Sequence, residues 1–289
     1  MSSPEPRGEK PRNGSRLTRP LTRRQILKYV SGLAALPAAG SVYSFGIEPA
    51  RVVIEHRTVK LPGLAAPFSA AQISDIHFHG VNRTLHKAAA LLSKIKPNLL
   101  LITGDLAETR EELPGCLRWI DSLGFSGLAY FCPGNWEYWS GNWEAGLAKM
   151  LENQGIVCLQ NRNIMVKSGG AEFLLVGIDD AFYGSALLKQ SFAGQPDNCP
   201  TVVISHAPCV IHRLEKYHAD VILSGHTHGG QVVLPFVGAL KTPPGSAEFV
   251  SGHYQLQGKS MFVNRGLGTS ILPVRFACPP EITLINFTG

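Results

Sequence analysis

The sequence lacks long hydrophobic runs, since none of its apolar stretches reaches the roughly 18 uninterrupted residues of a membrane-spanning helix. Charged residues are also few, at 17% of the 289 residues, whereas hydrophobic residues make up 44%. A wholly disordered chain needs the opposite balance, with many charges and few apolar side chains. These shortages exclude a confident membrane span and general disorder, and they leave a globular protein with a sizeable core.

Cysteine is sparse and scattered, because the six residues lie at least ten positions apart and no Cys-x-x-Cys pair occurs. Such pairs hold zinc ribbons and form thioredoxin-type redox sites, so both classes are excluded. The even number permits disulfides in an exported protein, but several cysteines lie in apolar runs where a buried free thiol is equally ordinary. The sequence leaves their pairing open.

Two enzyme signatures are missing as well. There is no Gly-x-Ser-x-Gly motif, which leaves serine-hydrolase chemistry without a nucleophile. The stretch Gly258-Lys259-Ser260 resembles the end of a phosphate-binding loop, but the glycine required five positions earlier is His253. We expect a turn between two strands at Gly258 instead.

The net charge of +6 lies entirely in the first 28 residues, which hold eight basic and two acidic side chains. The remaining 19 basic and 19 acidic residues cancel over residues 29–289. A protein that binds nucleic acid through the phosphate backbone needs its positive charge on the folded domain. We therefore expect no nucleic-acid partner.

The N-terminal region has the composition of a targeting segment. Residues 1–21 are rich in proline, arginine and serine, and we expect a disordered basic tail there. Residues 22–47 place Arg23 and Arg24 ahead of an apolar run, a layout that resembles a twin-arginine export signal, with an amphipathic first helix as the alternative. No clear Ala-x-Ala site follows, which favours an uncleaved membrane anchor over a cleaved signal. The folded domain is expected at residues 48–289.

Short apolar runs that end in polar residues predict buried strands. These runs are 71–75, 99–105, 128–135, 173–179, 201–206 and 221–226. Helical patterns lie between several of them, near 83–96, 109–123, 142–154 and 208–218. This alternation is typical of an α/β layered domain. Later runs without helices predict a more antiparallel end to the chain, near 231–236, 260–264 and 281–287.

The polar residues that end these strands form a set of metal-compatible side chains. They are Asp75, His77, Asp105, Asn135, His206, His226 and His228. In open α/β sheets the carboxyl ends of the strands are where ligands bind, because the loops converge there. Two carboxylates, one amide oxygen and four imidazoles, with no thiolate, suit manganese, iron or zinc. Seven ligands are too many for one tetrahedral ion and predict two divalent ions that share a carboxylate.

The series Asp-x-His, Gly-Asp, Gly-Asn, His and Gly-His-x-His resembles the calcineurin-like metallophosphoesterase superfamily. Two further stretches are similar to a branch of bacterial phosphodiesterases exported by the twin-arginine route, GHTHGGQVVLPFVG and VNRGLGTSILPVRFACPPEIT. The resemblance covers about residues 22–287. It implies a four-layer α/β (α+β) fold, a two-sheet β-sandwich flanked by helices.

The same resemblance implies a role for each candidate ligand. One ion would be held by Asp75, His77, Asp105 and His228. The other would be held by Asp105, Asn135, His206 and His226, with Asp105 bridging. A hydroxide shared by both ions would attack phosphorus in line while the ions neutralise charge on the phosphoryl oxygens. Asp105 is the central catalytic residue in this prediction.

One position departs from the family, which usually has histidine after the ligand asparagine to stabilise the transition state or protonate the leaving oxygen. Here Trp136 and Glu137 follow Asn135, and an indole cannot act as a general acid. General acid catalysis contributes about 10²–10⁴-fold and matters most for poor leaving groups. We therefore expect cleavage of phosphodiesters with good leaving groups, or of pyrophosphate bonds, above ordinary phosphomonoesters. His79 is a candidate substitute acid, with a supporting or solvent-exposed role as the alternative.

The segment after Asn135 also carries an aromatic cluster of Trp136, Tyr138, Trp139 and Trp143. Trp136 and Trp139 are candidates for lining an apolar substrate groove or a lipid interface, because aromatic rings with polar tips suit both. Core packing beneath the loop is the alternative.

The sequence thus predicts a phosphoester hydrolase that depends on two divalent metal ions, in a bacterial cell envelope. Its expected partners are a phosphoester or pyrophosphate substrate, lipid-linked in one version, the membrane through the N-terminal segment, and the twin-arginine machinery. A UDP-2,3-diacylglucosamine pyrophosphatase of lipid A biosynthesis is the alternative, because related enzymes also lack the histidine. That alternative favours the cytosolic face of the inner membrane. Further alternatives are a non-catalytic metal-stabilised binding protein and a peripheral membrane module.

Overall fold

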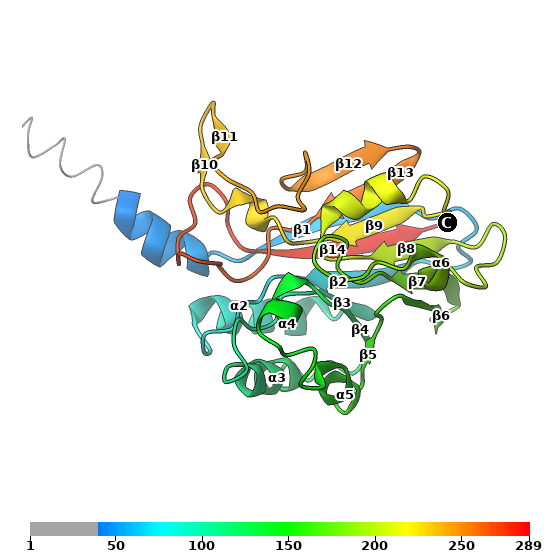
Figure 1. The fold of residues 1–289 in the computed structure, drawn as a ribbon, viewed down its shortest axis with the longest axis horizontal. Helices are drawn as coiled ribbons and strands as arrows, with labels where there is room; N and C mark the ends of the chain where they lie inside the picture. Colours follow the sequence, from blue (N-terminus) through cyan, green and yellow to red (C-terminus); the bar gives the residue numbers. More distant parts are fainter. Residues whose placement is uncertain (1–39) are drawn as a thin grey trace, which may run out of the picture. The chain divides into compact units, whose positions relative to one another are not determined.

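The computed structural model describes residues 40–289. The predicted basic tail at 1–21 and most of the predicted export segment at 22–47 lie outside the described residues. Among the residues that are described, no helix is both long enough and apolar enough to cross a bilayer. The unit Val42–Gly289 carries both sheets and the candidate site (Figure 1).

The first sheet has six strands in the order β1-β14-β2-β3-β4-β5. They are β1 (Val53–Lys60), β14 (Glu281–Thr288), β2 (Phe68–Ile73), β3 (Leu99–Thr103), β4 (Leu128–Cys132) and β5 (Ile156–Cys158). From β2 to β5 all neighbours are parallel, whereas β14 is antiparallel to β2 and parallel to β1. The carboxyl ends of β2, β3 and β4 therefore lie at one edge of this sheet.

The second sheet has the order β12-β13-β9-β8-β7-β6. Its strands are β12 (Gly252–Leu256), β13 (Lys259–Val263), β9 (Val221–Ser224), β8 (Thr201–Ile204), β7 (Ala171–Gly177) and β6 (Arg162–Ser168). The four inner strands are parallel, and β12 and β6 are antiparallel edges. The turn at Gly258 joins β12 to β13, which confirms it as a strand connection. A short separate hairpin pairs β10 (Val233–Leu234) with β11 (Gly238–Ala239).

Helical segments connect the strands. The α-helices are α2 (Arg83–Ile95), α3 (Leu113–Ser122), α4 (Asn135–Trp139), α5 (Leu147–Glu152) and α6 (Leu188–Ser191). A π-helical turn and three 3-10 turns complete them, η1 (Tyr43–Ile47), η2 (Glu48–Ala50), η3 (Pro208–Arg213) and η4 (His228–Gly230). Helix α2 begins where the Asn82 side chain accepts the backbone N–H of Leu85 at 3.0 Å, and it ends at Lys96 in the left-handed region.

The elements stack in four layers (Figure 1). One apolar cluster joins the first sheet to α2, α3 and α5, through side chains such as Ile102 and Leu117. A second fills the space between the sheets, where Phe68 stacks on Phe173 with ring centroids 4.4 Å apart. A third covers the outer face of the second sheet with η3 and α6. The predicted fold, a two-sheet sandwich flanked by helices, is confirmed.

Three local predictions differ from the structure. The helical pattern at 208–218 forms only over Pro208–Arg213, where the 3-10 turn η3 buries Val210 and Ile211. The run at 231–236 shortens to the two residues of β10, since Pro235 has no N–H for a longer ladder. The end of the chain is only partly antiparallel, because β13 pairs parallel with β9 and β14 with β1.

Candidate metal centre

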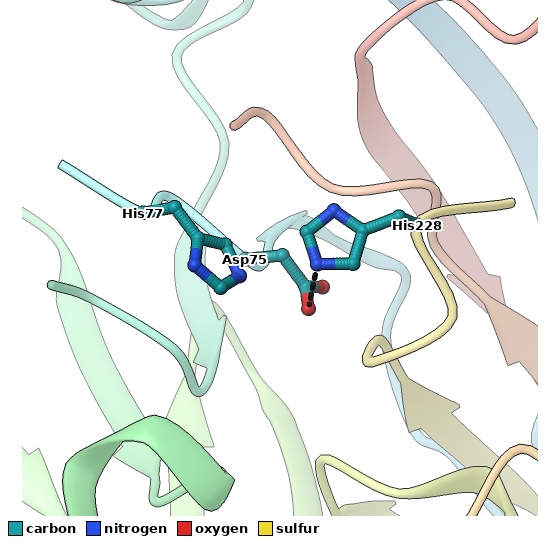
Figure 2. A group of neighbouring side chains, drawn as sticks. All are labelled: Asp75, His77 and His228. Atoms are coloured by element: carbon teal, nitrogen blue, oxygen red, sulfur yellow. Dashed lines mark ion pairs between the residues drawn. The ribbon is translucent and has the colours of Figure 1, made fainter. Parts of the chain in front are cut away.

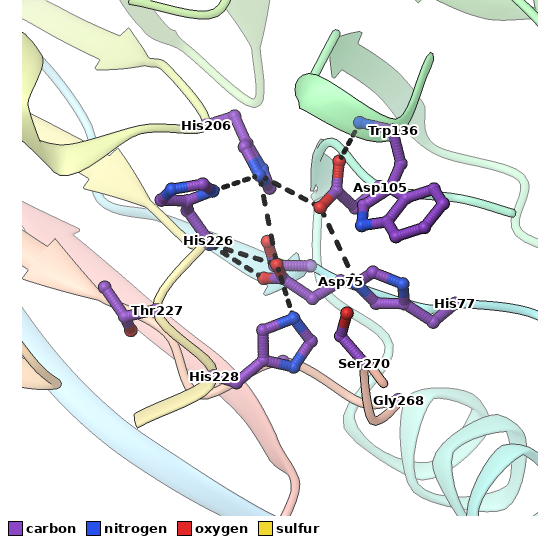
Figure 3. Close-up of polar contacts among 12 residues, drawn as sticks. Asp75, His77, Asp105, Trp136, His206, His226, Thr227, His228, Gly268 and Ser270 are labelled. Carbon is purple, nitrogen blue, oxygen red and sulfur yellow. Dashed lines mark hydrogen bonds and ion pairs between the residues drawn. The ribbon is translucent and has the colours of Figure 1, made fainter. Parts of the chain in front are cut away.

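All seven residues predicted as metal ligands lie where the carboxyl ends of the two sheets meet, and six of them are labelled in Figure 3. They follow β2 (Asp75, His77), β3 (Asp105), β4 (Asn135), β8 (His206) and β9 (His226, His228). Each is 6% exposed or less. The structure thus brings the whole predicted set together, as parallel strands that end at one edge should.

The first group consists of Asp75, His77 and His228, whose candidate ligand atoms all lie within 4.8 Å of one another (Figure 2). Nε2 of His228 is 3.4 Å from Oδ1 of Asp75. The ring of His77 lies beside that of His228, with centroids 4.7 Å apart. Two imidazoles and one carboxylate therefore converge on a space of the size that one ion needs.

The second group consists of Asp105, His206 and His226, which also lie within 4.8 Å of one another. Nε2 of His206 is 3.2 Å from Oδ2 of Asp105 and 3.0 Å from Nδ1 of His226. The amide oxygen of Asn135 is 3.1 Å from the same His206 nitrogen. The structure therefore places Asn135 with this group.

Asp105 lies between the two groups (Figure 3). Its Oδ2 is 3.2 Å from Nε2 of His206 and 3.6 Å from Nε2 of His77. Its other oxygen accepts the backbone N–H of Trp136 at 2.9 Å, which fixes the orientation of the carboxylate. One carboxylate thus faces ligand nitrogens on both sides, as a bridging ligand would.

The hydrogen bonds of His206 and His226 define which ring nitrogens face the centre. Nδ1 of His206 lies 2.7 Å from the carbonyl oxygen of Thr103, and Nε2 of His226 lies 2.8 Å from that of Pro244. A carbonyl only accepts, so each neutral ring donates its single N–H there. The remaining nitrogens then face each other as lone pairs at 3.0 Å. A cation or a proton between them is needed to make this contact favourable.

The backbone at the site is strained. Five of the seven candidate ligands have φ in the left-handed region, which non-glycine residues rarely adopt. They are Asp75 (48°), His77 (41°), Asp105 (58°), His226 (71°) and His228 (52°). Such residues cost about 1–3 kcal/mol each and persist where the surrounding structure holds them. Five of the fourteen described non-glycine residues with positive φ are therefore candidate ligands.

Two supporting carboxylates were not predicted from the sequence. Oε1 of Glu108 lies 2.8 Å from Nδ1 of His77 and so orients that ring. Glu137 is fully buried and accepts backbone N–H groups of Asp105, Leu106 and Gly134 at 2.9, 2.8 and 2.6 Å. Glu137 could have been found from its place two residues after Asn135, whereas nothing in the sequence distinguishes Glu108 from other acidic loop residues.

Charge interactions divide the histidines of the centre. Burial opposes a proton on His206, but the negative charges of Asp105 and Asp75 outweigh it and raise the pKa of His206 well above its ordinary value. Burial, together with the neighbouring His77 and Arg275, holds the pKa of His228 well below its ordinary value. His228 is therefore neutral near pH 7, the form that binds metals.

The residues present fit divalent metal ions. The centre is buried and contains only nitrogen and oxygen donors, the chemistry of manganese, iron or zinc sites. Nε2 of His77 and Nδ1 of His228 are buried without a hydrogen-bond partner. Unpaired buried nitrogens are unfavourable in an empty site and favourable around cations. Two candidate sites, one per group, fit two ions.

The predicted aromatic cluster separates into two parts. The hydroxyl of Tyr138 bonds to Asp179, and Trp143 packs against the core, so both have structural roles. The ring of Trp136 packs edge-on against that of His77, with centroids 5.9 Å apart, and edge-on against that of Trp139, with centroids 5.3 Å apart. Trp139 is half exposed. These two rings lead from the centre to the surface, where a groove was expected.

His79 lies outside the buried centre. Its side chain is half exposed, and its Nδ1 is 2.6 Å from Oε1 of Glu112. Its Nε2 is 3.7 Å from Glu108, whose other oxygen contacts His77. Glu108 therefore connects His79 to a candidate ligand, while the ring itself remains open to solvent.

Fold and site together define the class of a metal-dependent phosphoesterase, with two donor groups that share a carboxylate between two sheets. The sequence model of the family described as calcineurin-like phosphoesterase matches residues 68–230, which hold all seven candidate ligands. The chain belongs to this family.

Relatives in the family match nearly the whole chain. The metallophosphoesterase YkuE of Bacillus subtilis, described as uncharacterized, is 28% identical and the match covers 92% of this chain and 97% of YkuE. The phosphodiesterase YaeI of Escherichia coli is also 28% identical, with 92% and 99% covered. The UDP-2,3-diacylglucosamine pyrophosphatase LpxG of Chlamydia trachomatis is 26% identical, with 90% and 97% covered.

Proposed function

We propose that the protein is a phosphoester hydrolase that uses two divalent metal ions and favours phosphodiester or pyrophosphate bonds with good leaving groups. The observation that carries the proposal is the pair of buried donor groups on either side of the carboxylate of Asp105. Nε2 of His77 and Nδ1 of His228 have no hydrogen-bond partner there, so bound cations would be favourable where the family's chemistry needs them.

The proposed ligand sets follow the two groups. One ion would be held by Asp75, His77, Asp105 and His228, and the other by Asp105, Asn135, His206 and His226. When bound, the ions would supply Lewis acidity and a nucleophile generated from water. The chain's own residues position the donors, because Glu108 orients His77 and the Thr103 carbonyl orients His206. The backbone N–H of Trp136 holds Asp105 in the bridging orientation.

The preference for good leaving groups rests on Trp136. Its backbone N–H is already donated to Asp105, and its indole does not titrate near neutrality, so no acid stands directly after Asn135. A leaving phosphate or aryl oxide needs little protonation, whereas an alkoxide needs a proton. We propose His79 as the group that supplies a proton when one is required, because Glu112 fixes its exposed ring near the centre.

A lipid-linked pyrophosphate is the second candidate substrate, favoured by two observations. The relative LpxG is named a UDP-2,3-diacylglucosamine pyrophosphatase. The rings of Trp136 and Trp139 form a row with two more rings. The centroid of Tyr183 is 4.4 Å from that of Trp139, and the centroid of Phe182 is 4.8 Å from that of Tyr183. Each neighbouring pair in this row of four rings packs edge-on. Such an apolar row suits an acyl chain that extends away from the centre.

We further propose that residues 22–47 direct export by the twin-arginine machinery and anchor the protein in the cell envelope. Arg23 and Arg24 ahead of the apolar run support this proposal. If the lipid pyrophosphate is the substrate, the cytosolic face of the inner membrane is the alternative location. A reporter fused after Gly289 distinguishes the two, because it is exported in the first case and stays in the cytosol in the second.

The decisive experiment compares four substrates with the manganese-loaded full chain in detergent. They are bis-p-nitrophenyl phosphate, p-nitrophenyl phosphate, an alkyl phosphomonoester and a UDP-linked diacyl sugar. Asp105→Asn is the blank. We expect metal-dependent turnover of the aryl diester above both monoesters. Turnover of the UDP lipid well above the diester would establish the second candidate, and no turnover of any of the four would contradict the proposed function.

A further inference from the structure

Three segments expose large apolar side chains at one end of the folded unit. They are Val42, Phe45 and Ile47 of the first turns, Phe236, Val237 and Leu240 of the β10–β11 hairpin, and Ile271 and Leu272 of the loop before β14. We call these eight residues the apolar patch. Single exposed apolar residues are ordinary, but a contiguous group of this kind marks a surface that binds something.

Backbone and side-chain contacts hold the three segments side by side. The N–H of Val233 in β10 donates to the carbonyl of Phe276 at 2.9 Å. The N–H of Ser270 donates to Oε1 of Gln231 at 2.7 Å, which ties the loop to the hairpin. The ring of Tyr43 packs edge-on against Phe276 with centroids 6.3 Å apart. In Figure 1 the three segments lie at the same end of the molecule.

The patch projects into solvent. Phe236 is fully exposed, Ile271 is 88% exposed and Val237 is 70% exposed. The backbone φ angles of Phe236 and Ile271 are 65° and 67°, in the left-handed region that bulky residues avoid. The folded chain therefore keeps these side chains exposed although the backbone conformation is unfavourable. Among the described residues, no protein neighbour buries them.

The sequence around the patch has no exposed acidic side chain, since Glu48, which follows Ile47, is fully buried. Residues 229–246 and 265–280 contain no aspartate or glutamate, and Lys241 is the one exposed cation in the two stretches. An interface with a soluble protein usually has a charged and polar rim. Apolar side chains at turn tips without acidic neighbours instead suit insertion among lipid acyl chains.

We propose that the apolar patch docks in a lipid bilayer, with Phe236 and Ile271 as the side chains that enter it. The apolar run of the sequence from Tyr29 to Ile47 ends inside the patch, because Phe45 and Ile47 belong to both. A membrane-bound segment would thus lead directly into a membrane-bound surface of the folded unit. This goes beyond anchoring by residues 22–47, because it gives the folded unit its own contact with lipid and a fixed orientation.

Docking would place the candidate centre beside the membrane surface. The loop that carries Ile271 also carries Gly268, whose N–H donates to the carbonyl of Asp75 at 2.7 Å. Figure 3 shows Gly268 and Ser270 beside His77 and His228. A phosphoester in a lipid headgroup would reach the centre without leaving the bilayer. This last consequence rests on the proposed function, whereas docking itself does not.

Photo-crosslinking of the full chain tests the docking. Benzoylphenylalanine replaces Phe236, Ile271 or, as the matched control, Leu187, which is a half-exposed apolar residue beside α6 outside the patch. Each protein is reconstituted in vesicles of phosphatidylethanolamine and phosphatidylglycerol that carry a traceable phospholipid, and is then irradiated. Adduct formation requires no catalysis, so it is independent of whether the phosphoesterase proposal holds.

We expect lipid adducts at positions 236 and 271 in clear excess over position 187. The eight patch residues are uncharged, so the adduct yield per membrane-bound chain should hardly change between low and high salt, whereas the basic residues 1–28 affect only how much of the chain is bound. Yields no higher than at Leu187 would overturn the proposal. Adducts mainly to residues 1–39 of the same chain, or to a second copy, would overturn it too, because the patch would then be covered by protein.

A second variant separates docking from folding. Phe236→Asp with Ile271→Asp should remove the lipid adducts formed by benzoylphenylalanine at Leu240, while turnover of the soluble aryl diester stays unchanged. Both residues are exposed, so the change leaves the core intact. Persistent lipid adducts at position 240 in this variant would contradict insertion of the two tips.

Discussion

His206 and His226 face each other across 3.0 Å through nitrogens that have no proton left to share in the neutral state. Both rings donate their N–H to backbone carbonyls, of Thr103 and Pro244. The two sheets therefore bring two acceptors together at the centre of a buried site. Two unpaired acceptors in a low dielectric are unfavourable, so the contact needs positive charge. A proton on His206 supplies it in the metal-free protein, because the negative charges of Asp105 and Asp75 raise the pKa of His206 well above its ordinary value. With both rings neutral, a bound divalent ion would supply it.

Glu137 ties the loop after β3 to the loop after β4, because its carboxylate accepts N–H groups from both. Burial raises the pKa of Glu137 to about 7, with the charge of Asp105 adding to it. Glu137→Gln directs an amide NH₂ at backbone donors. We expect a loss of about 2–4 kcal/mol in the free energy of unfolding, measured by urea denaturation. Glu144→Gln, at an exposed position, should change it by less than about 0.5 kcal/mol. Equal values for the two variants would contradict the role of Glu137.

Gly104 has a φ of +82°, and a Cβ there would lie 2.6 Å from Nδ1 of His206. Gly104→Ala therefore combines backbone strain with displacement of a candidate ligand. Gly80→Ala is the matched control, since φ is +100° and nothing lies within 4 Å of its Cβ. We expect the control to lose about 1 kcal/mol of stability and to keep its metal affinity. Gly104→Ala should lose more stability and most of its affinity for manganese, which calorimetry can measure. Unchanged affinity would show that His206 is not a ligand.

Trp136→His tests the leaving-group argument, because it restores the family's usual residue after Asn135. We expect turnover of an alkyl phosphomonoester to rise by about 10–10²-fold relative to turnover of the aryl diester. The ratio of the two kcat/KM values is the measurement, since it cancels differences in metal loading. The backbone N–H to Asp105 is retained in this variant. A ratio that does not move would mean that the indole does not limit the choice of leaving group.

The cysteines give a prediction on pH. All six are free thiols, which answers the question that the sequence left open for the described structure. Burial raises the pKa of Cys158 to about 12 and that of Cys209 to about 11, from an ordinary value near 9. Native thiols should therefore react slowly with iodoacetamide at pH 8 and rapidly in denaturant.

The sign of the stability effect follows from the same shifts. A thiol whose folded pKa is raised contributes stability that is present below pH 9 and is lost as pH rises towards 11 and 12. Cys209→Ser should lose less stability between pH 9 and pH 11 than the native chain does, by urea denaturation. An identical pH profile would place the Cys209 thiol in water rather than in the protein.

The sequence predicted the centre better than the local structure around it. Asp75, Asp105 and His206 could be located because each follows an apolar run that reads as a buried strand, and the ends of parallel strands coincide. The predictions failed where the pattern is short or half exposed. Strand β1 was not predicted, because its residues alternate only weakly between buried and exposed. The pairing of β14 with β1 could therefore not be predicted either.

The supporting contacts could not be predicted, because they join residues far apart in sequence without a repeating pattern. Glu108 meets His77 across 31 positions, and Pro244 meets His226 across 18. The resemblance assigned His226 and His228 to different ions, and the structure places them in different groups, with a left-handed φ at both residues. The supporting contacts depend on loop conformation, which a single sequence does not specify.

The central claim is that the buried centre binds two divalent ions through a shared Asp105. The most direct test is the manganese content of the purified full chain after equilibrium dialysis, compared with Asp105→Ala. The account predicts two ions per native chain and a loss of both tight sites in Asp105→Ala, because each group depends on that carboxylate. One ion or none in the native chain, or two tightly held ions in Asp105→Ala, would contradict it.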